Sequence, residues 1–209
     1  MRKFIFKIFK VYKYMLNLVL NISDHIATYL VLYSNNAEFS TFVSKGIPKV
    51  NISSEGICLI GENFRMNNRE LSNPIGRFHR CSIIVSGEGQ LTIGNNVGMS
   101  STGLVCHHKI VIGDNVRIGG NVVIYDTDFH SLNAEDRLNL QKDQLHTKKA
   151  PVIIQDNVFV GAHSTILKGV TVGENSVIGA CSVVTKDVPP NEIWAGNPAK
   201  FLKTTQNTL

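Results

Sequence analysis

Residues 154–189 read IQDNVFVGAHSTILKGVTVGENSVIGACSVVTKDVP, and this stretch divides into six consecutive hexads. An aliphatic residue opens each hexad, and a serine or valine stands four residues after it. The openers are Ile154, Val160, Ile166, Val172, Ile178 and Val184. The later positions hold Val158, Ser164, Val170, Ser176, Ser182 and Val188. A strand changes face every two residues and a helix repeats every 3.6, so neither period alone keeps a register of six. The chain is therefore expected to turn a corner after every hexad.

Three hexads close one triangular turn of 18 residues. The short strand on each side should point its opening aliphatic residue and its small later residue inwards, where stacked coils bury them. The corners are expected at Gly161, Gly169, Gly173 and Gly179, because glycine adopts positive φ angles at little cost. The repeat thus predicts an all-β fold, built as a parallel β-helix solenoid.

The hexads become less regular towards the N-terminus, where the coil is expected to begin at about Gly56. A register slip between Val105 and Ile112 predicts a bulge or a shifted corner, and residues 66–80 are expected to form a loop. The register stops again over residues 125–151. A loop of that length beside a rigid scaffold is usually functional, and its Asp, His, Arg and Lys residues suit an active-site wall.

At the C-terminal end, residues 156–203 read DNVFVGAHSTILKGVTVGENSVIGACSVVTKDVPPNEIWAGNPAKFLK. This string resembles the hexapeptide-repeat acyltransferases, in particular the maltose, galactoside and nodulation-factor O-acetyltransferases and their polysaccharide-modifying relatives. The resemblance extends over roughly residues 56–203. It implies a left-handed parallel β-helix, a homotrimer with sites between subunits, and acetyl-coenzyme A as the donor, with no metal ion. The left hand comes from the resemblance, because right-handed crossovers are the general rule.

Length and composition suit one buried domain with a short extra segment. We expect a helical segment over residues 1–35, the acyltransferase domain over residues 36–203 and a tail over residues 204–209. Four cysteines without a CxxC pair, and no cleavable signal-peptide pattern, favour free thiols in the cytoplasm. The net charge of +5 equals the five basic residues that precede the first acidic one. A nucleic-acid-binding core is therefore not expected.

The N-terminal segment is rich in aromatic and aliphatic residues and contains no Gly or Pro. On a helix, Lys3, Lys7 and Lys10 share one arc opposite an apolar face. We expect residues 1–20 to contact the anionic inner face of the plasma membrane as a peripheral helix. Polar residues interrupt the apolar run well short of the roughly 20 residues that a spanning helix needs. The alternative is that the helix packs on the β-helix or on a neighbouring subunit.

The string DTDFH ends at His130, and Arg137 follows seven residues later. The resemblance makes this His the catalytic base, because the maltose and nodulation-factor enzymes carry a His and an Arg at the same separation. An imidazole suits the task, since its unperturbed pKa near 6.5 lets it take the acceptor's proton as the oxygen attacks the thioester. Asp126 or Asp128 is expected to orient the ring, and geometry must choose between them. Arg137 is a candidate substrate-binding residue, with pinning of the loop as the alternative.

Acceptor contacts are expected where the coil is least regular. The resemblance places acceptor-sugar contacts near Ser100, Ser101, His107 and His108, whose polar side chains suit binding to hydroxyl groups. The alternative is that all four are ordinary corner residues.

Donor contacts are expected along the last coils. The positions that match pantetheine contacts in the resembling enzymes are Ala162, Ala180 and Thr185, and small side chains there would let a thin chain approach the backbone. Phe159 stands where those enzymes have Trp, which keeps an apolar wall but loses an indole donor. Lys200 and Lys203 would neutralise coenzyme A phosphates as point charges. The alternative for each of these residues is corner packing or a solvated tail.

Four other functions are alternatives to the transfer of an acetyl group to a sugar hydroxyl. A zinc enzyme on the same coil would need three converging histidines, and no such set is evident in the sequence. The motifs of serine acetyltransferases are not visible. An amino-sugar N-acetyltransferase is harder to separate, because the same His can serve an amine acceptor. A non-catalytic trimeric scaffold is the least consistent with the DTDFH string. The sequence therefore predicts transfer of an acetyl group to a sugar hydroxyl of a cell-surface polysaccharide or lipopolysaccharide precursor.

Overall fold

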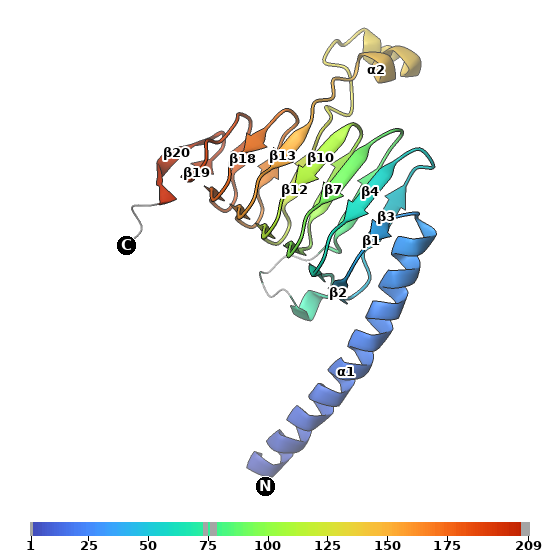
Figure 1. Cartoon of the computed structure of the whole chain (residues 1–209), viewed down its shortest axis with the longest axis vertical. Coiled ribbons are helices and arrows are strands. Elements are labelled where there is room, and N and C mark those ends of the chain that lie inside the picture. The colour runs from blue at the N-terminus through green and yellow to red at the C-terminus, as the bar shows by residue number, and fades with distance from the viewer. Residues whose placement is uncertain (1, 73–74, 76–78, 206–209) are drawn as a thin grey trace.

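The computed structural model describes residues 2–72, 75 and 79–205. A long helix, α1 (Arg2–Ser34), precedes a β-helix whose coils stack along one axis (Figure 1). Successive strands fall in turn into three sheets, here called A, B and C. In the C-terminal coils, paired residues such as Phe159 and Val177 are 18 positions apart. The predicted three-sided turn of 18 residues is confirmed.

Within the described residues the strands of the three sheets pair in parallel, except for the terminal hairpin of β19 (Glu192–Gly196) and β20 (Ala199–Thr204), which is antiparallel. Sheet A contains β1 (Glu38–Phe39), β4 (Ile57–Ile60), β7 (Gln90–Ile93), β10 (Lys109–Ile112), β13 (Val152–Ile154) and β16 (Thr171–Val172). Sheet B contains β2 (Phe42–Lys45), β5 (Phe64–Asn67), β8 (Gly98–Ser100), β11 (Arg117–Ile118), β14 (Phe159–Val160), β17 (Val177–Ile178), β19 (Glu192–Gly196) and β20 (Ala199–Thr204). Sheet C contains β3 (Lys49–Ile52), β6 (Ser82–Val85), β9 (Gly103–Cys106), β12 (Val123–Tyr125), β15 (Thr165–Ile166) and β18 (Val183–Val184).

The core is a column of side chains inside the coil. All six aliphatic residues that open the hexads of residues 154–189 are fully buried, and the six residues four positions later are at most 2% exposed. The inward serines are satisfied by backbone carbonyls; Ser176 Oγ, for example, donates to Pro189 O at 2.7 Å. The predicted inward register is therefore confirmed.

Asparagines rather than glycines take positive φ at the corner between sheets A and B, and the expectation for the glycines is largely wrong. Of the four predicted glycines only Gly169 has a positive φ, at +78°. The A–B corners carry Asn63, Asn96, Asn115, Asn157, Asn175 and Asn191, all with φ between +55° and +62°. Their side-chain amides form a ladder of hydrogen bonds of 3.1 to 3.2 Å from coil to coil. Asn tolerates the left-handed region because its short polar side chain can be satisfied locally.

The other three glycines are required by close packing between coils. A Cβ atom on Gly161 would lie 2.5 Å from the nitrogen of Ala180, and one on Gly173 would lie 2.4 Å from the nitrogen of Pro190. One on Gly179 would lie 2.7 Å from the Cβ of Ala195. Glycine is therefore required at such a corner because the next coil approaches closely, and not because the φ angle is positive.

The coil begins about one turn earlier than expected. The first turn runs through β1, β2 and β3, upstream of Gly56, with Phe42 and Ser44 directed inwards. Strands of four residues and corners of variable length replace the hexads there, so the inward residues do not recur every six positions. The register slip near Val105 lies at the C–A corner, where only His107 and His108 separate β9 from β10.

The predicted extrusion leaves the coil between β12 and β13. Paired residues across it, such as Val123 and Thr165, are 42 positions apart instead of 18. Residues 126–151, here called the excursion, contain the short helices η2 (Asp136–Leu138) and α2 (Leu140–His146), and α2 stands away from the coil (Figure 1). Its two ends meet through a bridge between Thr127 and Lys149. The segment from Asn68 to Arg80, which contains η1 (Glu70–Ser72), also departs from the coil, and residues 73–74 and 76–78 lie outside the described part.

The predicted N-terminal helix is present as α1, and it touches the coil only through its last third. Asp24, Thr28 and Leu32 are its buried residues. The Asp24 carboxylate accepts from the backbone N–H of Gly46 and pairs with Arg69. The remainder of α1 runs away from the first coil (Figure 1), with its large apolar side chains exposed. The tail expected over residues 204–209 is described only as far as residue 205.

Candidate active site

The candidate catalytic His lies at the start of the excursion and is paired with a carboxylate. The Nδ1 atom of His130 is 2.7 Å from the Oδ2 atom of Asp143, which lies in α2. The His130 side chain is 69% exposed, whereas that of Asp143 is only 9% exposed. The hydrogen bond from His130, followed by that from the Ser131 amide, holds the pKa of Asp143 below its usual value. An ionised carboxylate only accepts, so Nδ1 carries a proton, and in the neutral ring the lone pair is on Nε2.

The backbone next to His130 is fixed by Ser131. The Ser131 N–H donates to Asp143 Oδ1 at 2.6 Å, and its Oγ donates to Asp136 Oδ2 at 2.9 Å. Arg137 donates from its guanidinium to the Ser131 carbonyl at 2.7 Å. On the other side of His130, Phe129 has a φ of +63°, a strained angle for an aromatic residue. These contacts hold the imidazole at one position relative to α2.

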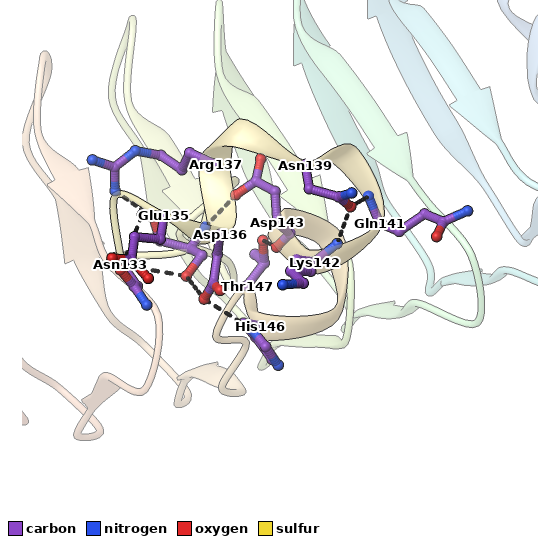
Figure 2. Close-up of polar contacts among 11 residues, drawn as sticks. Asn133, Glu135, Asp136, Arg137, Asn139, Gln141, Lys142, Asp143, His146 and Thr147 are labelled. Atoms are coloured by element: carbon purple, nitrogen blue, oxygen red, sulfur yellow. Dashed lines mark hydrogen bonds and ion pairs between the residues drawn. The ribbon is translucent and has the colours of Figure 1, made fainter.

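A second His–carboxylate pair lies in the same excursion. His146 Nδ1 is 2.8 Å from Asp136 Oδ2, and Figure 2 shows this pair beside the short helices η2 and α2. Hydrogen bonds from His146 and then Ser131 lower the pKa of Asp136. Asn139 caps α2 by accepting from the amides of Gln141 and Lys142 at 3.0 and 3.1 Å. The excursion therefore has its own polar core, which supports the first pair.

The expected orienting carboxylates, Asp126 and Asp128, do not pair with His130. Asp126 is fully buried, and its two oxygens accept the backbone N–H groups of His107 and His108 at 2.7 Å each. Asp128 instead lies 2.8 Å from the ammonium group of Lys168. The expectation assumed that residues 126, 128 and 130 share one face of an extended strand. The positive φ of Phe129 breaks that alternation, so the ring turns towards α2 instead.

His107 lies at the C–A corner next to the neck of the excursion. Its ring centroid is 5.9 Å from that of Phe129, which also contacts the ring of Tyr125. Partial burial lowers the pKa of His107; the charge of Asp126 opposes this shift and that of Lys149 adds to it. His107 and Lys149 line a cavity of about 490 Å³ at this corner. The predicted acceptor-contact residue is thus packed against the residue that precedes His130.

The predicted donor-binding residues lie at two edges of sheet C. Ala162 and Ala180 occupy successive B–C corners, where the Cys181 N–H donates to the Ala162 carbonyl at 2.9 Å. Thr185 follows β18 at the C–A corner. The structure therefore does not bring the three residues together within one chain.

Ser100 and Phe159 line the same groove on sheet B, away from the C–A corner at which the excursion leaves the coil. This groove has a volume of about 260 Å³ and also contains Arg65 and Arg117. Ser100 Oγ accepts from Asn67 Nδ2 at 2.9 Å, and the Phe159 ring is 49% exposed. The groove joins a residue predicted for the acceptor with one predicted for the donor, but it does not contain His130.

The basic residues of the C-terminal hairpin are exposed. Lys200 pairs with Ala195 and Lys203 with Ile193 in the β19–β20 ladder, so both lie in a strand and not in a disordered tail. Neither lysine forms an ion pair with any residue that the structure describes. Two free positive charges at the C-terminal end of sheet B are therefore available to an anionic ligand.

Within residues 2–72, 75 and 79–205, no group of three or more His, Cys, Asp or Glu side chains is arranged to hold a metal ion.

Two residues of the site, Asp143 and Ser131, were not predicted from the sequence. An N-cap signal at Asn139 before the segment LQKDQLH would have predicted a short helix, but no spacing rule links position 143 to His130.

The coil is the part of the chain that matches known proteins. Residues 151–186 match the family described as bacterial transferase hexapeptide (six repeats). Galactoside O-acetyltransferase of Escherichia coli is 42% identical over 100 residues, which cover 48% of this chain and 46% of that protein. The matched part thus spans about half the length of the curated relatives.

Two crystal structures extend the comparison. A hexapeptide-repeat-containing acetyltransferase of Vibrio cholerae has a TM-score of 0.54 at 29% identity, covering 69% of this chain and 72% of that chain. An N-acyltransferase of Bacillus cereus has a TM-score of 0.60 at 21% identity, covering 80% and 83%, and shows likeness of fold alone. The repeats, the three-sided parallel coil and these matches agree: residues 151–186 match the hexapeptide-repeat transferase family, and the larger coil is similar to a solved acetyltransferase with such repeats.

Proposed function

We propose that this protein is an acyltransferase that moves an acetyl group from acetyl-coenzyme A to a saccharide hydroxyl. The observation that carries the proposal is the His130–Asp143 pair, because it leaves the exposed Nε2 atom as a base of fixed orientation. The name of the Escherichia coli relative, a galactoside O-acetyltransferase, supports a sugar acceptor. The acceptor is proposed to belong to a cell-surface polysaccharide or lipopolysaccharide precursor.

The proposed reaction needs no covalent enzyme intermediate. Nε2 of His130 takes the hydroxyl proton as the acceptor oxygen attacks the thioester carbonyl, and the carbon–sulfur bond then breaks. The imidazolium returns its proton to the departing sulfur, so the products are an acetyl ester and free coenzyme A. Asp143 stabilises the imidazolium and holds the ring, as the third member of a triad does. His130 is thus the catalytic residue and Asp143 a positioning residue.

Donor binding is proposed to lie between subunits of a left-handed homotrimer. Ala162 and Ala180 on one edge of sheet C and Thr185 on the other edge would face one another only across two chains. Lys200 and Lys203 carry the unpaired charges proposed to meet the coenzyme A phosphates. Mixing inactive His130→Ala chains with inactive Ala162→Trp chains should restore part of the activity if each site draws on two subunits. No recovery of activity on mixing, together with a monomeric mass by light scattering, would contradict this arrangement.

An amino-sugar N-acetyltransferase is the second candidate, because the same imidazole can accept a proton from an ammonium acceptor. A paired panel of acceptors separates the two: each sugar is supplied with either a hydroxyl or an amine at the same carbon. Release of coenzyme A only with the amines would replace the O-acetyltransferase proposal.

We also propose that α1 attaches the protein to the anionic inner surface of the plasma membrane. Among the described helices, α1 alone is long and apolar enough to cross a membrane by length and composition. Its uncharged run from Tyr14 to Ser23 would extend only about 15 Å, half of the roughly 30 Å hydrocarbon core, which favours an interfacial position. Each lysine near an anionic surface contributes about 1 kcal/mol. Replacing Lys3, Lys7 and Lys10 with Glu should therefore abolish binding to vesicles that contain anionic lipid, and equal binding by wild type and variant would contradict the proposal.

The main test of the function is thiol release from acetyl-coenzyme A with the acceptor panel, compared in wild type, His130→Ala and His146→Ala. His146 is the matched control, because it pairs with Asp136 in the same excursion at almost the same distance. Loss of about 10² to 10⁴ in rate is expected for His130→Ala, with a much smaller change for His146→Ala. Equal rates in wild type and His130→Ala would remove His130 from the chemistry. Failure to bind acetyl-coenzyme A at all would favour a non-catalytic scaffold.

A further inference from the structure

A cavity lies on sheet C, away from the C-terminal hairpin. It has a volume of about 750 Å³. Its floor is formed by the first residues of successive strands of sheet C, including Lys49 and Val123, and its side by the B–C corner residues Ser101, Asn121 and His163. Arg80 closes it from the end of the loop that follows η1. We call it the sheet C pocket.

Two side chains that border the pocket have buried polar atoms without partners. Ser101 is 3% exposed, and its Oγ forms no hydrogen bond with the residues that the structure describes. The same holds for both amide atoms of Asn121. A buried polar group without a partner is destabilising, so such groups need an explanation. A ligand rich in hydroxyl groups would supply both donors and acceptors to them.

The charge of the lining is of one sign. Lys49 and Arg80 are exposed side chains with no ion pair among the described residues, His79 and His163 add two imidazoles, and no Asp or Glu lines the pocket. Arg binds carboxylate and phosphate through paired N–H groups, and Lys binds them as a point charge. The chemistry therefore favours a ligand that combines hydroxyl groups with an oxyanion.

The pocket is connected to the proposed reaction centre through one strand. Val123 in the pocket and Tyr125 are on the same outward face of β12, about 7 Å apart at the usual rise of a strand. Tyr125 contacts the ring of Phe129, which precedes His130. At the pocket's other side, His163 follows the predicted donor residue Ala162. A saccharide in the pocket would thus lie along the sheet that carries both parts of the proposed site.

We propose that the sheet C pocket binds an anionic acceptor saccharide, with Lys49 and Arg80 recognising a carboxylate or phosphate group and Ser101 and Asn121 recognising hydroxyls. This inference rests on the proposed acetyl transfer and names the substrate class. The other source of an oxyanion is coenzyme A itself. Its proposed phosphate contacts are Lys200 and Lys203 on β20, whereas the pocket is built on β3, β6, β9 and β12, so the acceptor is the occupant that the position favours.

The kinetic test uses two acceptors that differ only in charge, methyl glucuronide and methyl glucoside, with wild type, Lys49→Gln, Arg80→Gln and the control Lys45→Gln. Lys45 is an exposed lysine on sheet B, outside the pocket. A hydrogen bond to a charged group contributes about 1.5–3 kcal/mol, so the KM for the glucuronide should rise roughly 10- to 100-fold in the two pocket variants. The KM for methyl glucoside, the KM for acetyl-coenzyme A and kcat should change little. A rise in the KM for acetyl-coenzyme A instead would assign the pocket to the donor and overturn the proposal.

A binding experiment tests the sheet C pocket even if no acetyl transfer is found. Saturation-transfer NMR with methyl glucuronide and methyl glucoside is applied to the same four proteins without acetyl-coenzyme A. Signal from the glucuronide that is lost in Lys49→Gln and Arg80→Gln, but kept in Lys45→Gln, supports the pocket even where turnover is absent. Equal signals from both sugars in all four proteins would overturn it. Circular dichroism of each variant excludes misfolding as the cause of a loss.

Discussion

The imidazole of His130 and the carboxylate of Asp143 are joined by a hydrogen bond of 2.7 Å although 13 residues separate them in the sequence. Both belong to the excursion, and Ser131 links them a second time through its backbone N–H. The pair is thus positioned by a short helix that stands outside the β-helix. The coil supplies a rigid support, whereas the excursion orients the imidazole that is proposed to act as the base.

Replacing Asp143 with Asn should lower kcat while leaving the fold of the coil unchanged. An amide can hold the wrong tautomer, and neutralising the corresponding carboxylate of a Ser-His-Asp triad costs about 10⁴ in kcat. We expect a loss of at least about tenfold in kcat and a smaller effect on the KM for acetyl-coenzyme A. The Asp136→Asn variant is the matched control. An unchanged kcat in Asp143→Asn would contradict a positioning role for Asp143.

The order of the excursion should depend on pH in acid. The pKa values of Asp136 and Asp143 are both lowered by their hydrogen bonds to His146 and His130. A carboxylate with a lowered folded-state pKa contributes stability above its unfolded-state pKa, and this contribution is lost as the pH falls through the lowered value. Hydrogen exchange of residues 129–147 should therefore accelerate, relative to the coil strands, as the pH falls below the ordinary Asp value of 3.8. The Asp136→Asn, Asp143→Asn double variant should show no such pH dependence; a flat wild-type response would contradict the prediction.

The coil was predictable from the sequence because its rule is local. Six residues per side and two inward positions decide burial, so Ile154 and Ser176 could be assigned to the core without any tertiary information. The partner of His130 could not be assigned in this way. Asp143 reaches it through a helix whose orientation depends on Ser131 and Asn139, and the nearer candidates, Asp126 and Asp128, are held by other partners. The sheet C pocket was equally hidden, since its residues come from coils far apart in the sequence.

The asparagine ladder gives a prediction about stability. Asn175 has a φ of +59° and lies in the middle of the ladder, bonded to Asn157 and Asn191 at 3.1 Å. Asn175→Ala removes the amide and leaves a Cβ atom in the left-handed region without the polar side chain that tolerates it, where the backbone alone costs about 1–2 kcal/mol. Asn175→Gly loses only the hydrogen bonds. In urea unfolding, the Asn175→Ala variant should therefore have a lower free energy of unfolding than the Asn175→Gly variant, although Ala is the better residue in regular structure elsewhere. The reverse order would show that the dihedral angle at position 175 does not matter.

The cysteines predict how the protein behaves in a thiol assay. Burial raises the pKa of Cys58 to about 12 and that of Cys81 to about 11, and burial followed by the charge of Asp126 raises that of Cys106 to about 12. The thiolate is the reactive form, so these three should react slowly. Cys181 is an exposed free thiol at a B–C corner. In native protein a disulfide reagent should label one thiol per chain quickly and the other three only after unfolding. Rapid labelling of all four cysteines in the wild type, and of the remaining three in Cys181→Ser, would mean that the coil opens.

The close approach between coils gives the last prediction. A methyl group on Gly161 would lie 2.5 Å from the Ala180 nitrogen and 2.8 Å from the Ile178 carbonyl oxygen, both of them backbone atoms that cannot rotate away. Gly161→Ala should therefore push apart two coils at the B–C corner, destabilise the chain by about 1–3 kcal/mol and weaken acetyl-coenzyme A binding at Ala162 and Ala180. Gly98→Ala is the matched control, because its nearest neighbour would be the flexible Arg117 side chain at 3.5 Å. Calorimetric melting and acetyl-coenzyme A titration of the two variants should separate them; equal melting temperatures would show that the stacked corners yield more easily than the distances indicate.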